Sequence, residues 1–169
     1  MASSHPQRKR IRLESFDYSN PGTYFLTVVT HNRKCYFGNI EREEMCLNPA
    51  GRMLDLWWRE LVKKFPGVEL HEYCIMPNHF HAIVMLHEGD GPAGSRPDLQ
   101  AVVQWYKTMT TNAYILGVRN QGWQPFAGTL WQRSYYDHII RDEADLQRVR
   151  EYIVNNPLKW AIDEENPQK

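Results

Sequence analysis

The chain has 169 residues, of which 42% are hydrophobic, 12% aromatic and 24% charged, and this size and composition indicate one folded domain, not a disordered chain. Twenty basic and twenty acidic residues cancel, so the overall charge does not indicate a polyanionic partner. No apolar run reaches the roughly 18 residues of a membrane span and no secretory leader is recognisable, so we expect neither membrane insertion nor secretion. The three cysteines lack the spacing of a disulfide framework or a zinc site, which favours a reducing, cytoplasmic setting.

Charge is concentrated near the two ends of the chain. The first twelve residues contain a basic cluster with no acid among them, Arg8, Lys9, Arg10 and Arg12, and an acidic cluster near the end consists of Asp163, Glu164 and Glu165. We therefore divide the chain into a basic arm over 1–20, a single domain over 21–162 and an acidic tail over 163–169. A basic arm can hold phosphates although the whole chain is neutral; a solvated arm without a partner is the alternative.

Hydrophobic periodicity and turn residues predict the main elements. In chain order they are a strand over 23–30, a helix over 49–65, strands over 68–75 and 80–86, a helix over 98–116, a strand over 135–140 and a helix from 142 to 155. A short extended piece is expected at 45–47, and the glycine- and proline-rich residues 87–98 are expected to form a loop. This order is that of the split β-α-β motif with one helix added. We therefore expect an α+β fold, a ferredoxin-like sandwich with an antiparallel sheet and an added C-terminal helix.

Two histidines stand on one face of the second strand of the predicted central hairpin. Alternate residues of a strand share a face, so His79 and His81 point the same way about 7 Å apart, while Phe80 points to the other face. Two such imidazoles can hold one metal ion between them. Ordinary hydrogen bonds are the alternative, but the apolar run around the pair favours ligands, because buried polar rings need partners.

The closing helix supplies further candidates. Tyr152 and Asn156 lie four residues apart on one helical face, beside Val149 and Ile153, whose spacing indicates packing on the sheet. The Asn156 amide oxygen and two imidazoles would form a shell for a divalent ion that completes its sphere with phosphate oxygens and water. The phenol of Tyr152, with an ordinary pKa of about 10, needs a cation or a base to become a nucleophile. The alternatives are a core tyrosine and a helix-ending asparagine before proline.

Together these motifs resemble the HUH single-tyrosine transposases, in particular the REP-associated tyrosine transposases. The resemblance is carried by Met76-Pro77-Asn78-His79-Phe80-His81, with the bulky hydrophobic residue of the family between the histidines, and by the segment REYIVNNPLKW over 150–160. Further matching segments are PGTYFLT over 21–27, LNPAG over 47–51 and LWQRSYYDH over 130–138.

The resemblance implies a metal-dependent endonuclease and strand transferase that cleaves single-stranded DNA near hairpins and supports DNA transposition. It implies that Tyr152 attacks the scissile phosphate, forms a 5′-phosphotyrosine link and releases a 3′-OH. His79 and His81 match the metal-binding pair, and Asn156 matches a third ligand of Mg²⁺ or Mn²⁺ that is often glutamine in related enzymes. A domesticated hairpin-binding protein without cleavage and a metallohydrolase that uses water are the alternatives.

DNA contacts are also expected from the irregular stretch before the last predicted strand. Trp131 and Arg133 are candidates there, since unpaired bases stack on aromatic rings; the alternative is that Trp131 and Tyr135 plug the sheet edge. The link of two residues between the last strand and the tyrosine helix, Arg141 and Asp142, favours local closure. We therefore expect a monomer in which Tyr152 serves its own chain, with a homodimer as the alternative.

Overall fold

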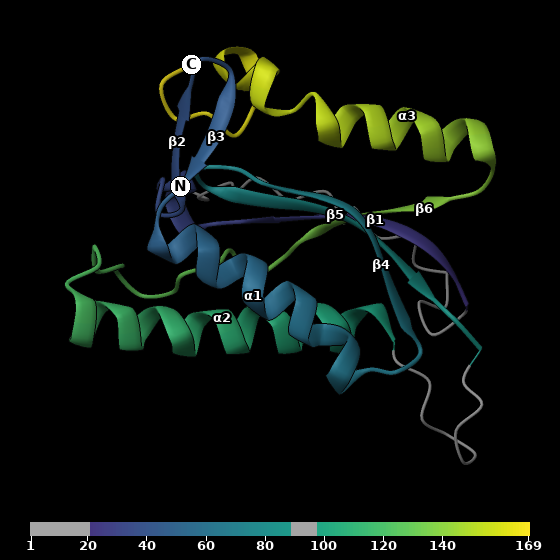
Figure 1. The fold of residues 1–169 in the computed structure, drawn as a ribbon, viewed down its shortest axis with the longest axis horizontal. Helices are drawn as coiled ribbons and strands as arrows, with labels where there is room; N and C mark the ends of the chain where they lie inside the picture. Colours follow the sequence, from purple (N-terminus) through teal and green to yellow (C-terminus); the bar gives the residue numbers. More distant parts are fainter. Residues whose placement is uncertain (1–20, 89–97) are drawn as a thin grey trace, which may run out of the picture.

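A four-stranded antiparallel sheet forms the centre of the computed structural model, which describes residues 21–88 and 98–169 (Figure 1). Its strands are β1 (Gly22–Val29), β4 (Val68–Ile75), β5 (His79–Leu86) and β6 (Tyr136–Ile140), in the spatial order β4-β5-β1-β6. This order places the two long, buried strands β1 and β5 in the middle, as the split β-α-β motif requires. The predicted α+β fold with an antiparallel sheet is confirmed.

The helices cover the sheet on both faces (Figure 1). Helices α1 (Pro49–Lys64) and α2 (Leu99–Gln121) lie on one face, and α3 (Glu143–Val154) lies on the other. Two short 3-10 helices, η1 (His31–Arg33) and η2 (Pro157–Ile162), follow β1 and α3 respectively. A hairpin of β2 (Gly38–Glu41) and β3 (Glu44–Leu47) stands apart from the main sheet. Among the described residues no helix is long and apolar enough to cross a membrane.

The alternation of side chains along the central strands creates two hydrophobic clusters. Residues such as Leu26 of β1 and Phe80 of β5 face α1 and α2, where the Phe80 ring lies 4.8 Å from Trp58 and 5.2 Å from Tyr106 between centroids. The opposite face carries a smaller cluster, made of Phe25, Ile83, Val149 and Ile153, under α3. Val149 and Ile153 of α3 belong to this cluster, and their packing holds α3 over the face of β5 that carries the histidines.

Local signals explain most element boundaries. Side chains of Asn48, Asp98 and Asp142 each accept a hydrogen bond from the backbone N–H three residues on, so the helix N-cap predicted at Asp142 is confirmed. Helix α2 was expected to stop before Gly117 but continues to Gln121. Gly117 lies inside the helix because the Trp123 ring packs where a Cβ would stand, and the helix ends instead at Gly122 with φ of 68°.

Other predicted boundaries moved by a few residues. The extended piece predicted at 45–47 is part of β3, whose partner β2 was not predicted. The last strand begins at Tyr136, one residue later than expected. The predicted loop lies partly, and the basic arm wholly, outside the described residues. The arm–domain–tail division stays a prediction.

Truncation of the central core ring tests this packing. We expect Phe80→Ala to lower the free energy of unfolding by about 3–5 kcal/mol, because Phe80 is fully buried among aromatic rings that cannot collapse into the space. The measurement is urea unfolding followed by circular dichroism. Val154→Ala, at an exposed apolar position of α3, is the control and should change the value by less than about 0.5 kcal/mol. Equal losses in both variants would contradict the assignment of the core.

Candidate active site

The two histidines of β5 lie under α3 in a buried position. His79 pairs with Val29 and His81 with Thr27 in the β1–β5 register, and the exposed fractions of the two histidines are 0% and 3%. Their ring centroids are 4.5 Å apart, closer than the backbone repeat of about 7 Å, because the rings lean toward each other. The structure thus brings the predicted pair together on the face opposite Phe80.

Hydrogen bonding to Asn78 fixes the tautomer of His79. The Asn78 Nδ2 donates to the backbone carbonyl oxygens of Arg33, at 2.8 Å, and Glu165, at 2.6 Å. Since carbonyl oxygens only accept, the amide must turn its Oδ1 toward His79 Nδ1, 2.8 Å away. Oδ1 can only accept, so His79 Nδ1 carries the proton. The neutral ring then keeps a lone pair on Nε2, which is buried and has no hydrogen-bond partner among the described residues.

His81 connects the pair to the tyrosine. Its Nδ1 lies 2.8 Å from Thr27 Oγ1, and its Nε2 lies 3.4 Å from the Tyr152 hydroxyl. The Tyr152 ring stands edge-on to both His81 and Phe25, with centroid separations of 5.1 and 5.9 Å, and is 41% exposed. Tyr152 is therefore held beside the His81 imidazole, and its ring is still accessible to solvent.

Two side chains with oxygen atoms, Asn156 and Asp163, lie near the two histidines. Asn156 follows α3 and is buried, and its Oδ1 has no hydrogen-bond partner among the described residues. Asp163 comes next to the histidines: ligand atoms of His79, His81 and Asp163 all lie within 4.8 Å of one another. Asp163 belongs to the acidic cluster of residues 163–165, which follows η2 and brings a carboxylate to the site. The cluster of acids was the only signal of this contact in the sequence.

The surroundings favour the neutral form of both imidazoles and the protonated form of the phenol. Burial lowers the pKa of His79, against the opposing charges of Asp163 and Glu165, and burial together with His79 lowers the pKa of His81 well below its usual range. Burial, reinforced by Asp163, raises the pKa of Tyr152. Neutral imidazoles offer the lone pairs that a metal ion requires, and the phenol needs additional positive charge to ionise.

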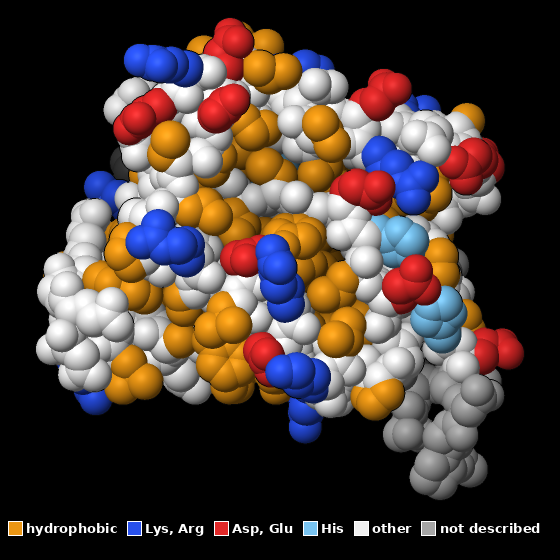
Figure 2. Space-filling view, viewed as in Figure 1, with side chains coloured by type: hydrophobic (Ala, Val, Ile, Leu, Met, Phe, Trp, Pro, Cys, Tyr) orange, Lys and Arg blue, Asp and Glu red, His pale blue; other side chains and the backbone are white. Residues whose placement is uncertain are grey.

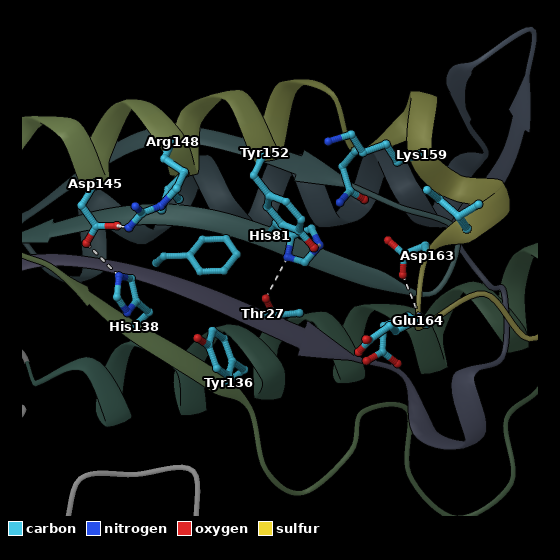
Figure 3. Close-up of a pocket in the computed structure, with 15 residues that line it drawn as sticks. Thr27, His81, Tyr136, His138, Asp145, Arg148, Tyr152, Lys159, Asp163 and Glu164 are labelled. Carbon is cyan, nitrogen blue, oxygen red and sulfur yellow. Dashed lines mark hydrogen bonds and ion pairs between the residues drawn. The ribbon is translucent and has the colours of Figure 1, made fainter.

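The site opens into a pocket of about 860 Å³ that runs along the sheet under α3. In Figure 3, His81 and Tyr152 lie in the middle, His138 and Asp145 on one side, and Asp163 and Glu164 on the other. The pocket therefore continues in both directions from the tyrosine hydroxyl.

Two predicted DNA-contacting residues lie away from this pocket. Trp131 is only 5% exposed; its ring packs 5.2 Å from Phe37, and its indole N–H donates to Thr110 Oγ1 of α2 at 3.0 Å. The prediction that Trp131 stacks on a base is therefore corrected: it bridges to Thr30 and fills the sheet edge. Arg133 is exposed, and a contact with DNA there stays a prediction. The cluster of Arg8, Lys9, Arg10 and Arg12 lies outside the described residues.

An antiparallel sheet with a His-hydrophobic-His pair on a central strand and a tyrosine on the covering helix is typical of the HUH single-tyrosine enzymes. The family model described as "Transposase IS200 like" matches residues 23–156, and the chain belongs to this family of tyrosine transposases, enzymes that act on DNA.

The chain is also similar to individual proteins and to a solved structure. An uncharacterized protein of Haemophilus influenzae is 35% identical over 165 residues, which cover 93% of this chain and 92% of the relative. A REP-associated tyrosine transposase of Escherichia coli is 26% identical over 142 residues, which cover 84% of this chain and 70% of the relative. The solved structure of a REP-associated tyrosine transposase bound to a REP hairpin has the same fold, with a TM-score of 0.61 at 24% identity, covering 88% of this chain and 74% of that one.

The tautomer of His79 can be measured directly. In protein with isotopically labelled histidine, long-range nitrogen–proton NMR at neutral pH should show the His79 proton on Nδ1, because Asn78 offers only an acceptor there. The signal is assigned by its loss in His79→Gln. Asn78→Leu should weaken the preference for this tautomer, with circular dichroism as the check on folding. A proton on Nε2 in the unaltered protein would contradict the orientation of the amide.

Proposed function

We propose that this transposase cleaves and rejoins single-stranded DNA near hairpins through a covalent link between Tyr152 and a 5′-phosphate, with a divalent cation held by the histidine pair. The observation that carries the proposal is the Tyr152 hydroxyl 3.4 Å from His81 Nε2, in an open pocket beside a second imidazole with an unpartnered Nε2. The hairpin substrate is supported by the structural relative, which is bound to a REP hairpin.

The residues present fit a divalent cation. His79 Nε2 and Asn156 Oδ1 are buried polar atoms without hydrogen-bond partners in the described part of the chain, which is costly unless a ligand satisfies them. His79 and His81 would supply nitrogens, and Asn156 and Asp163 would supply oxygens. Such a mixed set, with room left for phosphate oxygens and water, suits Mg²⁺ or Mn²⁺. We keep Asn156 as a proposed ligand and add Asp163.

The reaction then needs little from the chain beyond placement. A bound cation would supply positive charge at the scissile phosphate and favour the phenolate. The phenol releases its proton to water in the open pocket, the Tyr152 oxygen forms a bond to phosphorus, and the bond from phosphorus to the 3′ oxygen breaks. That oxygen gains a proton and leaves as a 3′-OH. The phosphodiester energy is kept in the phosphotyrosine link, so an incoming 3′-OH can reverse the step and join strands without a nucleotide cofactor.

We also propose a cytoplasmic monomer in which Tyr152 serves its own chain. Helix α3 follows β6 after only Arg141 and Asp142, and its residues Val149 and Ile153 pack on Phe25 and Ile83 of the same sheet. A helix tethered so closely pays less entropy to close over its own strands than over those of a second chain. The homodimer with exchanged helices remains the alternative that the mixing experiment below tests.

Covalent trapping tests the chemistry. The substrate is a library of single-stranded DNA with an imperfect hairpin and randomised flanks, incubated with Mn²⁺ and examined for an SDS-resistant adduct. Tyr152→Phe should lower adduct yield by more than about 1,000-fold, because only the attacking oxygen is removed. His79→Ala/His81→Ala should do the same while retaining DNA binding.

Tyr73→Phe removes a phenol oxygen that donates to Asp55 on the opposite face of the sheet, and is the matched control that keeps the adduct. Peptide mapping of the adduct to another tyrosine would reassign the nucleophile. Hairpin binding without an adduct under any condition would favour the domesticated binding protein, and strand cleavage that survives Tyr152→Phe would favour hydrolysis by water.

Mixing two inactive proteins tests the use of the tyrosine. One carries His79→Ala/His81→Ala and keeps Tyr152; the other carries Tyr152→Phe and keeps the histidines. In a monomer no site regains both parts, so we expect cleavage by the mixture to stay at the level of the separate variants. Recovery toward one quarter of normal activity, the share of complete sites when the two variants pair at random, would show that sites form between chains, and the monomer would be excluded.

A further inference from the structure

The face of the sheet that carries the histidines continues to the edge strand β6. His81 pairs with Thr27, and Thr27 pairs with Tyr136, so these three residues form one row across three strands. In the next row of the same face, Phe25 pairs with His138. With strands about 4.8 Å apart, Tyr136 stands about 10 Å from His81 along the sheet. The fold therefore places an aromatic and a polar residue of β6 at fixed positions beside the candidate active site.

The aromatic ring of Phe25 lies between His81 of the candidate active site and Tyr136 of β6. The Phe25 ring stacks on His81 with centroids 5.5 Å apart and an interplanar angle of 26°. It also meets Tyr136 edge-on at 6.1 Å, as it meets Tyr152 from another side. Phe25 itself is buried, whereas Tyr136 is 42% exposed and lines the pocket. Tyr136 thus offers the ring on which a flat ligand can stack next to the tyrosine hydroxyl.

A polar cluster stands beside this ring. The Asp145 carboxylate accepts hydrogen bonds from His138 Nε2 at 2.8 Å and from Arg148 Nη2 at 2.5 Å. Burial opposes ionisation of Asp145, but the hydrogen bonds from His138 and Arg148 outweigh it and lower its pKa. Because Nε2–H donates to the carboxylate, the neutral form of the His138 ring has Nδ1 as its acceptor. Asp145 therefore orients a hydrogen-bond acceptor and a guanidinium whose side chain is 74% exposed.

The two ends of the pocket differ in charge (Figure 3). Beyond Tyr152, the wall carries Asp163, Glu164 and Glu165 with Lys159, and Glu165 is paired with Arg33 at 2.6 Å. At the β6 end, Asp145 is the one carboxylate among the described residues that line the pocket, and it is paired with Arg148. Carboxylates without a basic partner repel phosphate groups. The phosphates of a nucleic acid strand that are not bound to the cation should therefore lie at the β6 end of the pocket.

We propose that Tyr136, His138 and Arg148 form a subsite for one unpaired nucleotide next to the scissile phosphate. The base stacks on Tyr136, an amino group of the base donates to His138 Nδ1, and Arg148 contacts the adjoining phosphate. Asp145 is a positioning residue for the last two. The volume of about 860 Å³ lies toward the upper end of the roughly 300–1,000 Å³ of ligand pockets, which leaves room for a nucleotide beside the catalytic group.

This subsite rests on the proposed function only for the identity of the neighbouring phosphate; binding itself is measurable without cleavage. The probes are fluorescent hairpin oligonucleotides selected from the library described above, titrated in EDTA against proteins that all carry Tyr152→Phe. Tyr136→Ala should weaken binding about 5- to 150-fold, the range for loss of one stacked base, and Tyr136→Phe should restore it. Arg148→Ala should also weaken binding and reduce its dependence on salt. Arg119→Ala, an exposed arginine of α2 on the other face of the sheet, is the matched control.

Abasic substitution separates stacking from a general loss of structure. When the flank is scanned with abasic sites, one position should abolish the difference between Tyr136→Ala and its parent, because the base that stacks is then missing. Binding by Tyr136→Ala within twofold of the parent, or a penalty unchanged at every abasic position, would overturn the subsite. If the wild-type chain forms the adduct but the subsite fails these tests, the proposed chemistry stands and the subsite is rejected. If the subsite is confirmed but no adduct forms, the subsite stands and the proposed chemistry is rejected.

Discussion

The whole arrangement depends on the alternation of side chains along β5, which is buried on both faces. Phe80 and its even-numbered neighbours fill the core against α1 and α2, and this packing holds the strand in one register. A slip by one residue would carry the imidazoles into the apolar core and the phenyl ring into the pocket. The register of the two histidines is therefore held in part by side chains on the face of β5 that points away from the pocket.

Burial also sets the protonation of the site before any ligand arrives. Two imidazoles in contact could not both be charged in this environment, and the amide of Asn78 determines which nitrogen of His79 carries the proton. The site thus contains one imidazole nitrogen, His79 Nε2, and one amide oxygen, Asn156 Oδ1, that have no hydrogen-bond partners within the described chain. Such unsatisfied groups lower stability in the free protein, and binding of a ligand that satisfies them would offset this loss.

The sequence predicted what depends on short-range patterns. Period-two alternation around His79, helical spacing of Tyr152 and Asn156, and the N-cap at Asp142 are local properties. The structure brings the histidine pair and Tyr152 together, and the Asp142 side chain caps α3. Contacts between residues far apart in the sequence were not predictable from such local patterns. Asp163 reaches the histidines through a 3-10 helix that begins at Pro157, where the pattern indicated only the end of a helix. Trp131 shows the converse error, since composition cannot tell an aromatic ring that fills a sheet edge from one that faces a ligand.

The orientation of Asn78 by the Glu165 carbonyl has a consequence for how the site is assembled. The histidines belong to the first half of the chain, but Asp163 and Glu165 follow every strand and every α-helix. During synthesis, the sheet and α3 can be in place while the amide of Asn78 still lacks one of its two carbonyl acceptors and the histidines lack a carboxylate neighbour. The residues that complete the site are therefore synthesised after those of the sheet and α3, so a chain interrupted before Asp163 would hold its core residues without a finished reaction centre.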